Sequence, residues 1–403
     1  MTNFFHRVFY PMAALCSALI TPTWAQPGAT RLQFENTQRL PGAVPRNDAA
    51  GECWAWRGAN EIMLSTPASS RLKLSGEFLD HQLSAEGRAL LAVEQLRAKP
   101  GEAGLVLRWC NAEGQPRGTH ALAWHEDDPL PQMILNHSGT HTLMVEPASA
   151  RVTLFDEAGQ VVRENLLFAD APYANERPVF LAASAKHFYV LSQFAPSTSM
   201  QVHAPALICF SLAGEEQWRR ELPLATSGYL ALAPSGNWLV ANTYEVRADR
   251  VNSAAAIFTA NGRQQAAFSG VVRAVSFSTT EKVLFALDRR ELRCVELASG
   301  KILWTSHLQN RAEMFVTSAA LPEPWSCIAL IGTSAFESGR FVFKNARLLG
   351  LDREGREQFA HALMEPLAQP RLVVAAGRQQ VLLGAEGMLQ SYQIITSAQR
   401  QRE

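Results

Sequence analysis

Tight polar turns recur along this chain at nearly regular intervals, and each lies between two short apolar segments. Residues 87, 139, 186, 236, 281, 323 and 377 mark these turns, and the intervals between them are 52, 47, 50, 45, 42 and 54 residues. This period is typical of β-propellers, in which each repeat forms one four-stranded blade. The turns span residues 84–87, 137–140, 184–187, 234–237, 278–281, 321–324 and 376–379.

A second series of glycine-containing turns alternates with the first. Glycine supplies the positive φ that tight hairpin turns require. Two alternating series of turns divide each repeat into four strands, and the segments between them, such as 239–241 and 282–287, are short and apolar. The sequence therefore predicts an all-β propeller of four-stranded antiparallel blades. The second series ends at Gly159, Gly214, Gly262, Gly300 and Gly355, with Gly114 as a weaker member.

The spacing of the turns favours seven blades. The last repeat offers strands near 371–375, 380–384 and 388–395 but no fourth strand. We expect the segment from Arg71 to Phe78 to supply it, so that an N-terminal strand closes the ring and no sheet edge stays exposed. Eight blades remain open, because residues 53–58 and 61–65 could form further strands.

The N-terminal 25 residues have the pattern of a secretory signal peptide. Arg7 precedes an apolar run over residues 8–20. Ala25 ends the segment that would form the signal-peptidase cleavage site, immediately before Gln26. The run is shorter than the ~20 residues that a membrane span needs. We therefore expect residues 1–25 to be a signal peptide, 26–50 a leader or linker, 51–396 the propeller and 397–403 a polar tail. The mature chain would carry no transmembrane segment and be periplasmic or secreted, and the sequence does not separate these destinations.

The charge and the cysteine content limit the class of binding partner and the disulfides that we expect. The chain has 37 basic and 37 acidic residues, a balance that argues against a nucleic-acid partner. Five cysteines remain after the predicted cleavage, and three of them, Cys110, Cys209 and Cys294, fall on the predicted third strands of separate blades, as small buried apolar side chains. Disulfides between Cys53 and Cys110 and between Cys294 and Cys327 remain open.

One polar cluster has metal-ligand residue types, namely His120, His125, Glu126, Asp127, Asp128, His137 and His141. The propeller repeat places residues 125–128 in a connector between blades and His137 in a turn at the other end of the following strand. A strand of six residues separates the two groups by about 20 Å. We therefore expect no metal site here, and no hydrolase, phosphate-loop or EF-hand signature occurs elsewhere in the sequence.

The longest segments between predicted strands gather on one face of the ring. Residues 94–104, 193–205, 244–253 and 333–345 join second to third strands, and residues 168–178 join two blades. Long loops on a rigid scaffold often bind partners, and aromatic and arginine side chains are enriched at interfaces. Such side chains on this face make up the candidate binding residues: Tyr173, Arg177, Tyr244, Arg247, Arg250, Phe336 and Arg340.

Two motifs resemble known propeller repeats. Residues 294–304, with Gly300 and Trp304, resemble the repeat of the quinoprotein-like propellers, in which a tryptophan packs between blades, and Gly214 and Trp218 repeat this spacing. The turn around Gly236 resembles that of WD40-like propellers. Other repeats depart from the pattern, since Arg163, Ala266 and Phe359 occupy the tryptophan position.

This resemblance implies a fold and, more weakly, a function. Quinone-dependent dehydrogenases of this type use a pair of adjacent cysteines, which this sequence lacks, so we expect no cofactor. Similar exported propellers often act as non-catalytic scaffolds in the cell envelope. We therefore expect a scaffold that binds a protein or peptide partner there, in an oligomeric state that the sequence does not define. The alternative is a propeller enzyme, such as a lactonase or a glycan-acting hydrolase or lyase, with acidic residues and histidines converging on the central channel.

Overall fold

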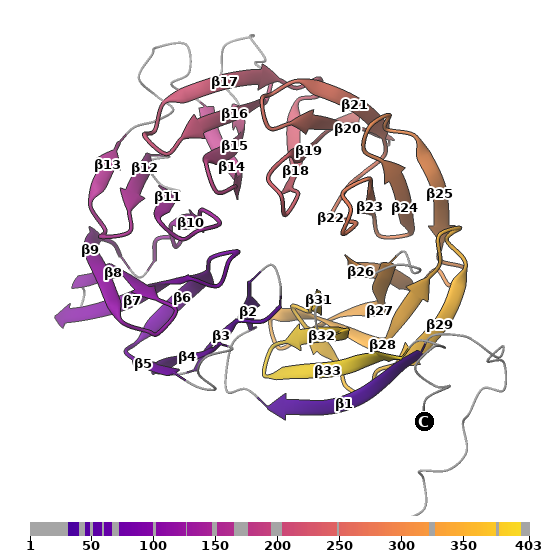
Figure 1. Cartoon of the computed structure of the whole chain (residues 1–403), viewed down its shortest axis with the longest axis horizontal. Helices are drawn as coiled ribbons and strands as arrows, with labels where there is room; N and C mark the ends of the chain where they lie inside the picture. Colours follow the sequence, from indigo (N-terminus) through magenta and orange to yellow (C-terminus); the bar gives the residue numbers. More distant parts are fainter. Residues whose placement is uncertain are drawn as a thin grey trace, which may run out of the picture.

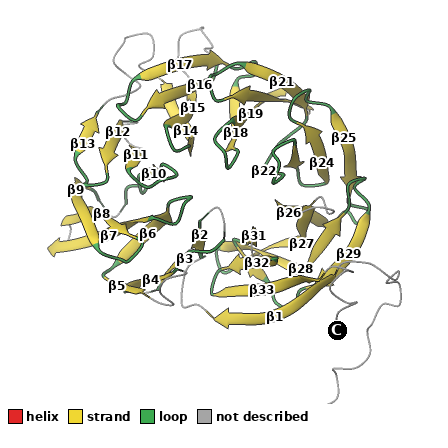
Figure 2. Ribbon diagram, in the orientation of Figure 1, coloured by secondary structure: helices red, strands yellow, loops and turns green. Residues whose placement is uncertain are grey.

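The strands of this chain form a ring of sheets around a central channel (Figures 1 and 2). The computed structural model describes residues 31–39, 45–48, 51–58, 60–66, 72–99, 102–125, 127–146, 151–164, 176–194, 204–247, 250–321, 327–375 and 379–395. The predicted signal peptide and the C-terminal tail lie outside these residues. No helix in the described part of the chain has the length and hydropathy needed to cross a bilayer.

Eight antiparallel sheets make up the ring, and we number these blades in the order of their inner strands. In seven of them the strands follow one another outward from the channel. Blade 1 contains β2 (Arg46–Asn47), β3 (Trp54–Arg57), β4 (Glu61–Ser65) and β5 (Leu72–Ser75). Blade 2 contains β6 (Phe78–Leu83), β7 (Ala89–Lys99), β8 (Glu102–Asn111) and β9 (Pro116–Ala123). Blade 3 contains β10 (Gln132–Leu135), β11 (His141–Val145), β12 (Val152–Asp156) and β13 (Val161–Arg163). Blade 4 contains β14 (Glu176–Ala183), β15 (His187–Phe194), β16 (Ala206–Ser211) and β17 (Glu216–Glu221).

The second half of the ring follows the same plan. Blade 5 contains β18 (Thr226–Leu232), β19 (Trp238–Arg247), β20 (Arg250–Thr259) and β21 (Gln264–Ser269). Blade 6 contains β22 (Ala274–Phe277), β23 (Val283–Leu287), β24 (Glu291–Glu296) and β25 (Ile302–His307). Blade 7 contains β26 (Glu313–Ala320), β27 (Cys327–Glu337), β28 (Arg340–Leu351) and β29 (Glu357–Ala362), and β30 (Leu367–Ala368) pairs with β28. Blade 8 contains β31 (Arg371–Ala375), β32 (Gln380–Ala385), β33 (Met388–Ile395) and, outermost, β1 (Arg31–Arg39).

The predicted propeller is confirmed, but the expectation of seven blades is wrong. The additional blade is blade 1, whose strands β3 and β4 come from the two segments that left eight blades open. An N-terminal strand does close the ring, yet it is β1, paired antiparallel with β33, and not the segment from Arg71 to Phe78. That segment contributes β5 at the outer edge of blade 1 and the first residue of β6. Residues 26–50, expected to be a leader or linker, thus contain β1 and β2.

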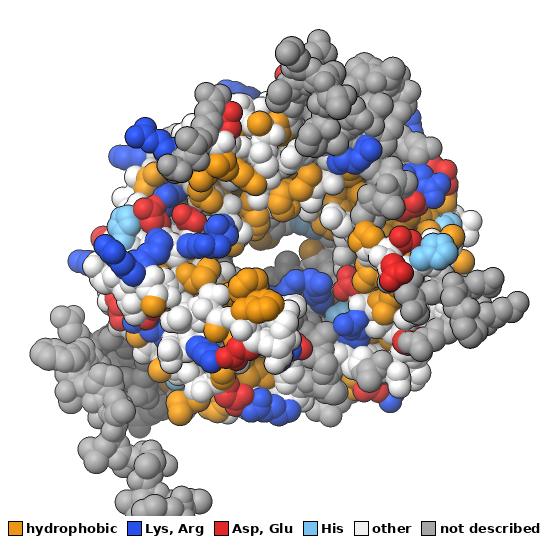
Figure 3. Space-filling view, turned by 180° about the vertical axis from the view of Figure 1, so that it is seen from behind, with side chains coloured by type: hydrophobic (Ala, Val, Ile, Leu, Met, Phe, Trp, Pro, Cys, Tyr) orange, Lys and Arg blue, Asp and Glu red, His pale blue; other side chains and the backbone are white. Residues whose placement is uncertain are grey.

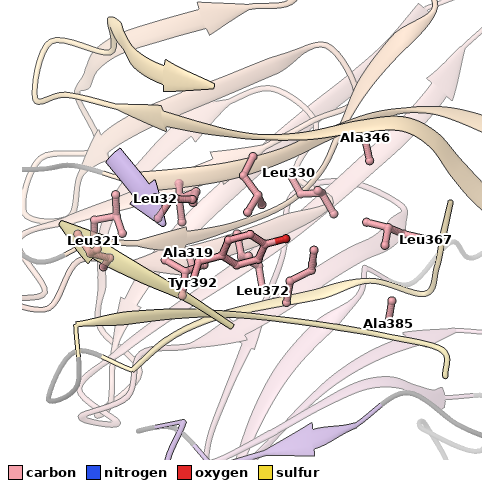
Figure 4. Close-up of a cluster of buried hydrophobic side chains, with 14 of the residues drawn as sticks. Leu32, Ala319, Leu321, Leu330, Ala346, Leu367, Leu372, Ala385 and Tyr392 are labelled. Atoms are coloured by element: carbon pink, nitrogen blue, oxygen red, sulfur yellow. The ribbon is translucent and has the colours of Figure 1, made fainter. Parts of the chain in front are cut away.

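Where the ring closes, side chains of β1 and β33 pack against the neighbouring blade 7. Leu32 of β1 and Tyr392 of β33 lie in one buried cluster with Leu330 of blade 7 (Figure 4). The ring of Phe34 meets the Tyr392 ring edge-on, with 5.7 Å between the centroids. The last blade therefore owes its outer strand, and part of its core, to the start of the described chain.

Each strand in the middle of a blade contributes to two cores. On β16, Ile208 and Phe210 pack in a cluster with blade 3, whereas Leu207 and Cys209 pack in a cluster with blade 5. Successive side chains of a strand point to opposite faces of its sheet, and both faces of a blade are covered by neighbours. This explains why the middle strands are apolar without alternation, and why so long a chain can bury its cores locally.

Tryptophans join neighbouring blades at the second series of turns. A Cβ on Gly262 would lie 2.5 Å from the Trp218 indole of the preceding blade, and the indole nitrogen donates to the Ala260 carbonyl at 3.1 Å. Gly355 meets Trp304 in the same way, with its nearest indole atom at 2.6 Å. The tryptophan packing implied by the quinoprotein-like resemblance is thus present between blades 4 and 5 and between blades 6 and 7.

The five described cysteines are all buried free thiols, so neither candidate disulfide forms. Cys53 lies against the Gly87 turn, whereas Cys110 belongs to a hydrophobic core of blades 1 and 2. Cys294 and Cys327 share one core, where burial raises the pKa of both thiols. The prediction that Cys110, Cys209 and Cys294 are small buried side chains in the cores between blades is confirmed.

Candidate functional site

Three of the long segments between strands are extended β-hairpins rather than loops. The ladder of β7 and β8 continues to the pair Lys99 and Glu102, that of β19 and β20 to Arg247 and Arg250, and that of β27 and β28 to Glu337 and Arg340. Because each hairpin joins the second and third strands of its blade, all three project from the same face of the ring. Most of the segment 193–205 lies outside the described residues.

The hairpin of β27 and β28 carries a solvent-exposed pair of aromatic rings. Phe336 and Phe341 lie opposite each other across the ladder, are 66% and 63% exposed, and meet edge-on with 5.2 Å between centroids. Ser338 and Gly339 both have positive φ, 50° and 80°, as a two-residue type I′ turn requires. The apolar pair is therefore held on a short, regular hairpin.

The other face of this hairpin is covered. Val342 is buried and pairs with Ala368 of β30, which lies in the connector to blade 8. Arg340 forms an ion pair with Glu386 of blade 8. Packing on one side and exposure on the other fix the direction in which Phe336 and Phe341 point.

The hairpin of β19 and β20 repeats this division into two faces. Val246 and Val251 are cross-strand neighbours with 62% and 53% exposure, and Tyr244 stands next to them on the same face. Glu245 and Asn252 alternate to the opposite face. An apolar side and a polar side thus run along the projecting ladder.

Other exposed apolar side chains lie on the same face of the ring. Leu96 lies on β7 near the end of the blade 2 hairpin, and Met364, 95% exposed, lies in the connector that follows β29. Connectors between blades open on the same face as the hairpins. We call this set the hairpin-tip surface: Leu96, Val246, Val251, Phe336, Phe341 and Met364.

Five of the seven candidate residues predicted from sequence fall on or near this surface. Tyr244 and Arg247 lie on β19, Arg250 begins β20, Phe336 is the penultimate residue of β27, and Arg340 begins β28. Of the other two, Arg177 is on β14, the inner strand of blade 4, and Tyr173 is outside the described residues. Sequence reasoning missed Leu96, Val246, Val251, Phe341 and Met364.

A missed signal was present in the hairpins. Tyr244, Val246, Val251 and Ser253 continue the two-residue alternation of a strand through a segment interpreted as loop. The Ser338 and Gly339 pair is a typical two-residue hairpin turn. Reading both together would have predicted projecting hairpins with paired apolar tips.

The central channel is the second candidate site. Inner strands and their turns enclose a cavity of about 740 Å³, lined mainly by apolar residues such as Leu181, Leu230 and Val373. Its acidic and histidine lining residues are Glu52, His137 and Glu281, and Tyr229 also lines it. The first three belong to the inner turns of blades 1, 3 and 6, so they stand apart around the ring.

The environments of these groups do not resemble an acid–base pair. Burial lowers the pKa of His137, and the nearby Glu86 carboxylate opposes that shift. The Glu281 carboxylate accepts a hydrogen bond from the Ser235 backbone amide at 2.8 Å. No group of three or more metal-binding side chains occurs among the described residues, and His125 and His137 lie at opposite ends of β10.

Comparisons with known proteins bear on the fold. No protein-family model matches the sequence, and no curated protein matches it in a sequence search. The Dos1 propeller superimposes with a TM-score of 0.58 at 9% identity, over 90% of this chain and 95% of that one. BamB from Moraxella catarrhalis gives 0.53 at 13% identity, over 90% and 100%, and a eukaryotic initiation factor gives 0.50 at 11%, over 85% and 92%. The resemblance to WD40-like and quinoprotein-like propellers is thereby confirmed, at the level of the fold alone.

Proposed function

We propose that this chain is an exported, non-catalytic β-propeller scaffold that binds a protein or peptide through the hairpin-tip surface. The observation that carries the proposal is the pair of cross-strand apolar contacts, Phe336 with Phe341 and Val246 with Val251, each more than half exposed. Covering such side chains stabilises a complex by about 25 cal/mol per Å² of apolar area. Because the hairpins are regular ladders, binding costs little conformational entropy.

Charged groups around these pairs suit the rim of an interface. Arg250 is exposed beside the valine pair, and Arg340 is held by Glu386 below the phenylalanine pair. Apolar anchors surrounded by arginine and other polar groups are typical of protein interfaces. This arrangement favours a folded protein or an extended peptide as the ligand.

The channel favours binding over catalysis. The enzyme alternative expects carboxylates and histidines that converge on the channel, whereas Glu52, His137 and Glu281 come from separate parts of the ring. Most of the other lining residues are apolar. We therefore place the function on the projecting hairpins.

Export is the part of the proposal that rests on the N-terminal sequence. Arg7, the apolar run over residues 8–20 and Ala25 have the pattern of a cleaved signal peptide. Mass spectrometry of the protein recovered from cell fractions should give a mature chain that begins at Gln26, in the periplasm or the medium. A chain that keeps residues 1–25 in the cytoplasm would contradict export.

The binding surface can be tested with two matched variants. The tip variant replaces Phe336, Phe341, Val246 and Val251 with serine, and the control variant replaces the exposed pair Val161 and Val162 on β13. Both start at Gln26 and are used to capture partners from an envelope extract. We expect one purified partner to bind the wild type and the control alike, and to lose at least tenfold in affinity for the tip variant.

A photo-crosslinking amino acid at position 341 supplies a second readout. It should give an adduct with that partner, whereas the same amino acid at position 161 should give none. Equal binding by the tip and control variants would contradict the assignment of this face. A thermal unfolding curve of each variant excludes loss of binding through unfolding.

A further inference from the structure

A small pocket lies between blades 2 and 3, on the face from which the hairpins project. It is lined by residues near the start of β8 and the end of β9, by the connector from β9 to β10, and by the residues that join β11 to β12. Its volume is about 130 Å³, whereas sites for whole small molecules usually measure roughly 300–1,000 Å³. The pocket therefore has room for one side chain of a partner.

Most of the pocket wall is apolar. Leu105 and Leu122 are cross-strand neighbours on β8 and β9, and Leu105 is 1% exposed in the core between blades 2 and 3. Leu122 and Trp124 are partly buried and pack against the same core. The connector adds Pro129 and Pro131 to the lining. A side chain that enters the pocket would thus meet leucine, proline and indole surfaces.

Hydrogen bonds within the connector hold Trp124 in place. Its indole Nε1 donates to the Asp128 carbonyl at 3.1 Å, and the Asp128 amide donates to the His125 carbonyl at 2.9 Å. The His125 amide donates in turn to the Asp128 carboxylate at 3.3 Å. The two prolines that follow have fixed φ angles. The pocket is therefore preformed, so binding costs little ordering of the connector.

The charged residues of the pocket leave it with an excess of negative charge. Arg151 donates from Nε and Nη2 to one carboxylate oxygen of Glu146, at 3.0 and 2.7 Å, so these two charges offset each other. Asp128 also lines the pocket, and it and Asp127 are exposed. Figure 3 shows Asp and Glu side chains beside hydrophobic ones on the side of the ring that holds blades 2 and 3, on the right in that view.

We propose that this pocket binds an aromatic side chain of the protein partner, from a segment in which a lysine or arginine stands next to it. An aromatic ring fills the pocket and makes an offset or edge-on contact with the Trp124 indole, which an aliphatic side chain does not. The basic neighbour is attracted by Asp128 and Asp127 at the rim. The inference deepens the proposed function and rests on it, because the pocket lies at the base of the blade 2 hairpin that carries Leu96.

The test measures binding of short blocked peptides to the chain from Gln26 onward, which keeps every described strand. Two probes, Lys-Phe-Lys and Glu-Phe-Glu, carry a 4-fluorophenylalanine whose fluorine NMR signal reports binding. We expect the lysine probe to bind saturably, and the glutamate probe to bind at least about threefold more weakly at low ionic strength. An excess of unlabelled Lys-Ala-Lys should not displace the lysine probe, because it has no ring for the pocket.

Variants of the pocket locate the bound ring. Trp124→Ala removes the indole wall and should weaken binding of the lysine probe at least about tenfold. Trp238→Ala is the matched control, because Trp238 is also half-buried but begins β19 at the opposite face, and it should leave binding unchanged. Asp128→Asn should narrow the difference between the lysine and glutamate probes. A thermal unfolding curve of each variant shows that it is folded.

The outcomes separate this proposal from the proposed function. The purified partner that depends on the hairpin-tip surface should also lose at least about fivefold in affinity for Trp124→Ala. If that partner binds Trp124→Ala as well as the wild type and still fails to bind the tip variant, the pocket proposal is wrong and the proposed function stands. Displacement by Lys-Ala-Lys, equal binding of the lysine and glutamate probes, or equal binding by Trp124→Ala and Trp238→Ala would overturn the pocket proposal alone.

Discussion

Single glycines at the second series of turns allow the blades to approach each other. Gly262 has a φ of 77° and lies against the Trp218 indole, whereas Gly339 has a φ of 80° and no atom within 4 Å of a built Cβ. The two positions share the same backbone conformation and differ in their surroundings. They therefore separate the cost of positive φ from the cost of contact between blades.

Replacing each glycine with alanine tests this distinction. Gly339→Ala should cost about 1 kcal/mol, because only the backbone conformation is disfavoured. Gly262→Ala should cost about 3 kcal/mol, since its Cβ would also displace the indole from the turn. Urea unfolding followed by tryptophan fluorescence measures both. Equal losses in the two variants would show that the indole moves aside without cost.

A buried histidine at the contact between blades 1 and 2 makes the stability of the fold depend on pH. His81 is 2% exposed and its Nε2 lies 3.1 Å from the Ala55 carbonyl oxygen. Burial lowers its pKa from 6.5 to about 4, with a further contribution from Arg46, against the opposing effects of the Ala55 carbonyl and Asp80. Below pH 6.5 the unfolded chain therefore binds a proton that the folded chain refuses, and stability falls as the pH falls from 6.5 toward 4.

His81→Gln should reduce this acid sensitivity. Glutamine keeps a donor for the Ala55 carbonyl and has no ionisable group, so the drop in unfolding temperature between pH 7 and pH 4.5 should be smaller than in the wild type. Calorimetry at both pH values measures the drop, and His307→Gln, whose side chain is 59% exposed, is the control. An unchanged drop in His81→Gln would assign the acid sensitivity to other groups.

At the scale of elements, the projecting hairpins add surface more than stability. The outer half of the β19–β20 ladder carries Val246 and Val251 in solvent, whereas Asn242 at its base is buried and donates to Ser253 and to the Ala254 carbonyl. The contrast predicts that the ladder can be shortened down to the Tyr244 and Ser253 pair without loss of the blade.

A variant that replaces residues 245–252 with Asn-Gly tests this prediction. Tyr244 and Ser253 are directly paired, and Asn-Gly is a favoured two-residue hairpin turn. Its unfolding temperature should stay within about 2 °C of the wild type, because the side chains described in this segment are mostly exposed. Asn242→Ala should lower it further, since buried hydrogen bonds are lost. A larger loss in the shortened variant would mean that the tip packs on the rest of the blade.

The elements also show which parts of the fold the sequence could predict. Middle strands such as β16 and β23 are short apolar runs next to tight polar turns, so periodicity located them. The turn spacing did not predict blade 1 as a separate repeat. Its inner strand, β2, has only two residues, and Gly51 precedes Gly87 by only 36 residues. The spacing of the marked turns is longer, so the sequence assigns residues 71–78 to the closing strand and leaves residues 53–58 and 61–65 open as further strands.

Outer strands are the hardest elements to predict. The closing strand β1 alternates Leu32 and Phe34 with polar residues over a short stretch and then becomes wholly polar, because its outer edge and one face meet solvent. Such a segment has the composition of a linker. The same limit applies to the candidate site, where cross-strand pairing, which no one-dimensional pattern states directly, brings Phe341 to Phe336 and Val251 to Val246.

At the scale of the whole molecule, one strand joins the two ends of the ring. Each of the other blades is made of consecutive strands, whereas blade 8 takes its outer strand from the start of the described chain. The pairing of β1 with β33 runs from Arg31 with Ile395 to Arg39 with Met388. Without β1, β33 would expose a sheet edge, and the core between blades 7 and 8 would lose Leu32.

A chain that starts at Pro41 should therefore unfold at a markedly lower temperature than one that starts at Arg31, by about 10 °C or more, and should aggregate through the bare edge of β33. A synthetic peptide of residues 31–39 should restore part of that loss in proportion to its concentration, because it can pair with β33 in trans. The variant Leu32→Asp, which keeps the strand but buries a charge in the core, should lie between the two chains. If the chain from Pro41 kept the unfolding temperature of the longer one, the eight cores between blades would hold the ring closed by themselves, and β1 would act only as a cover for the edge.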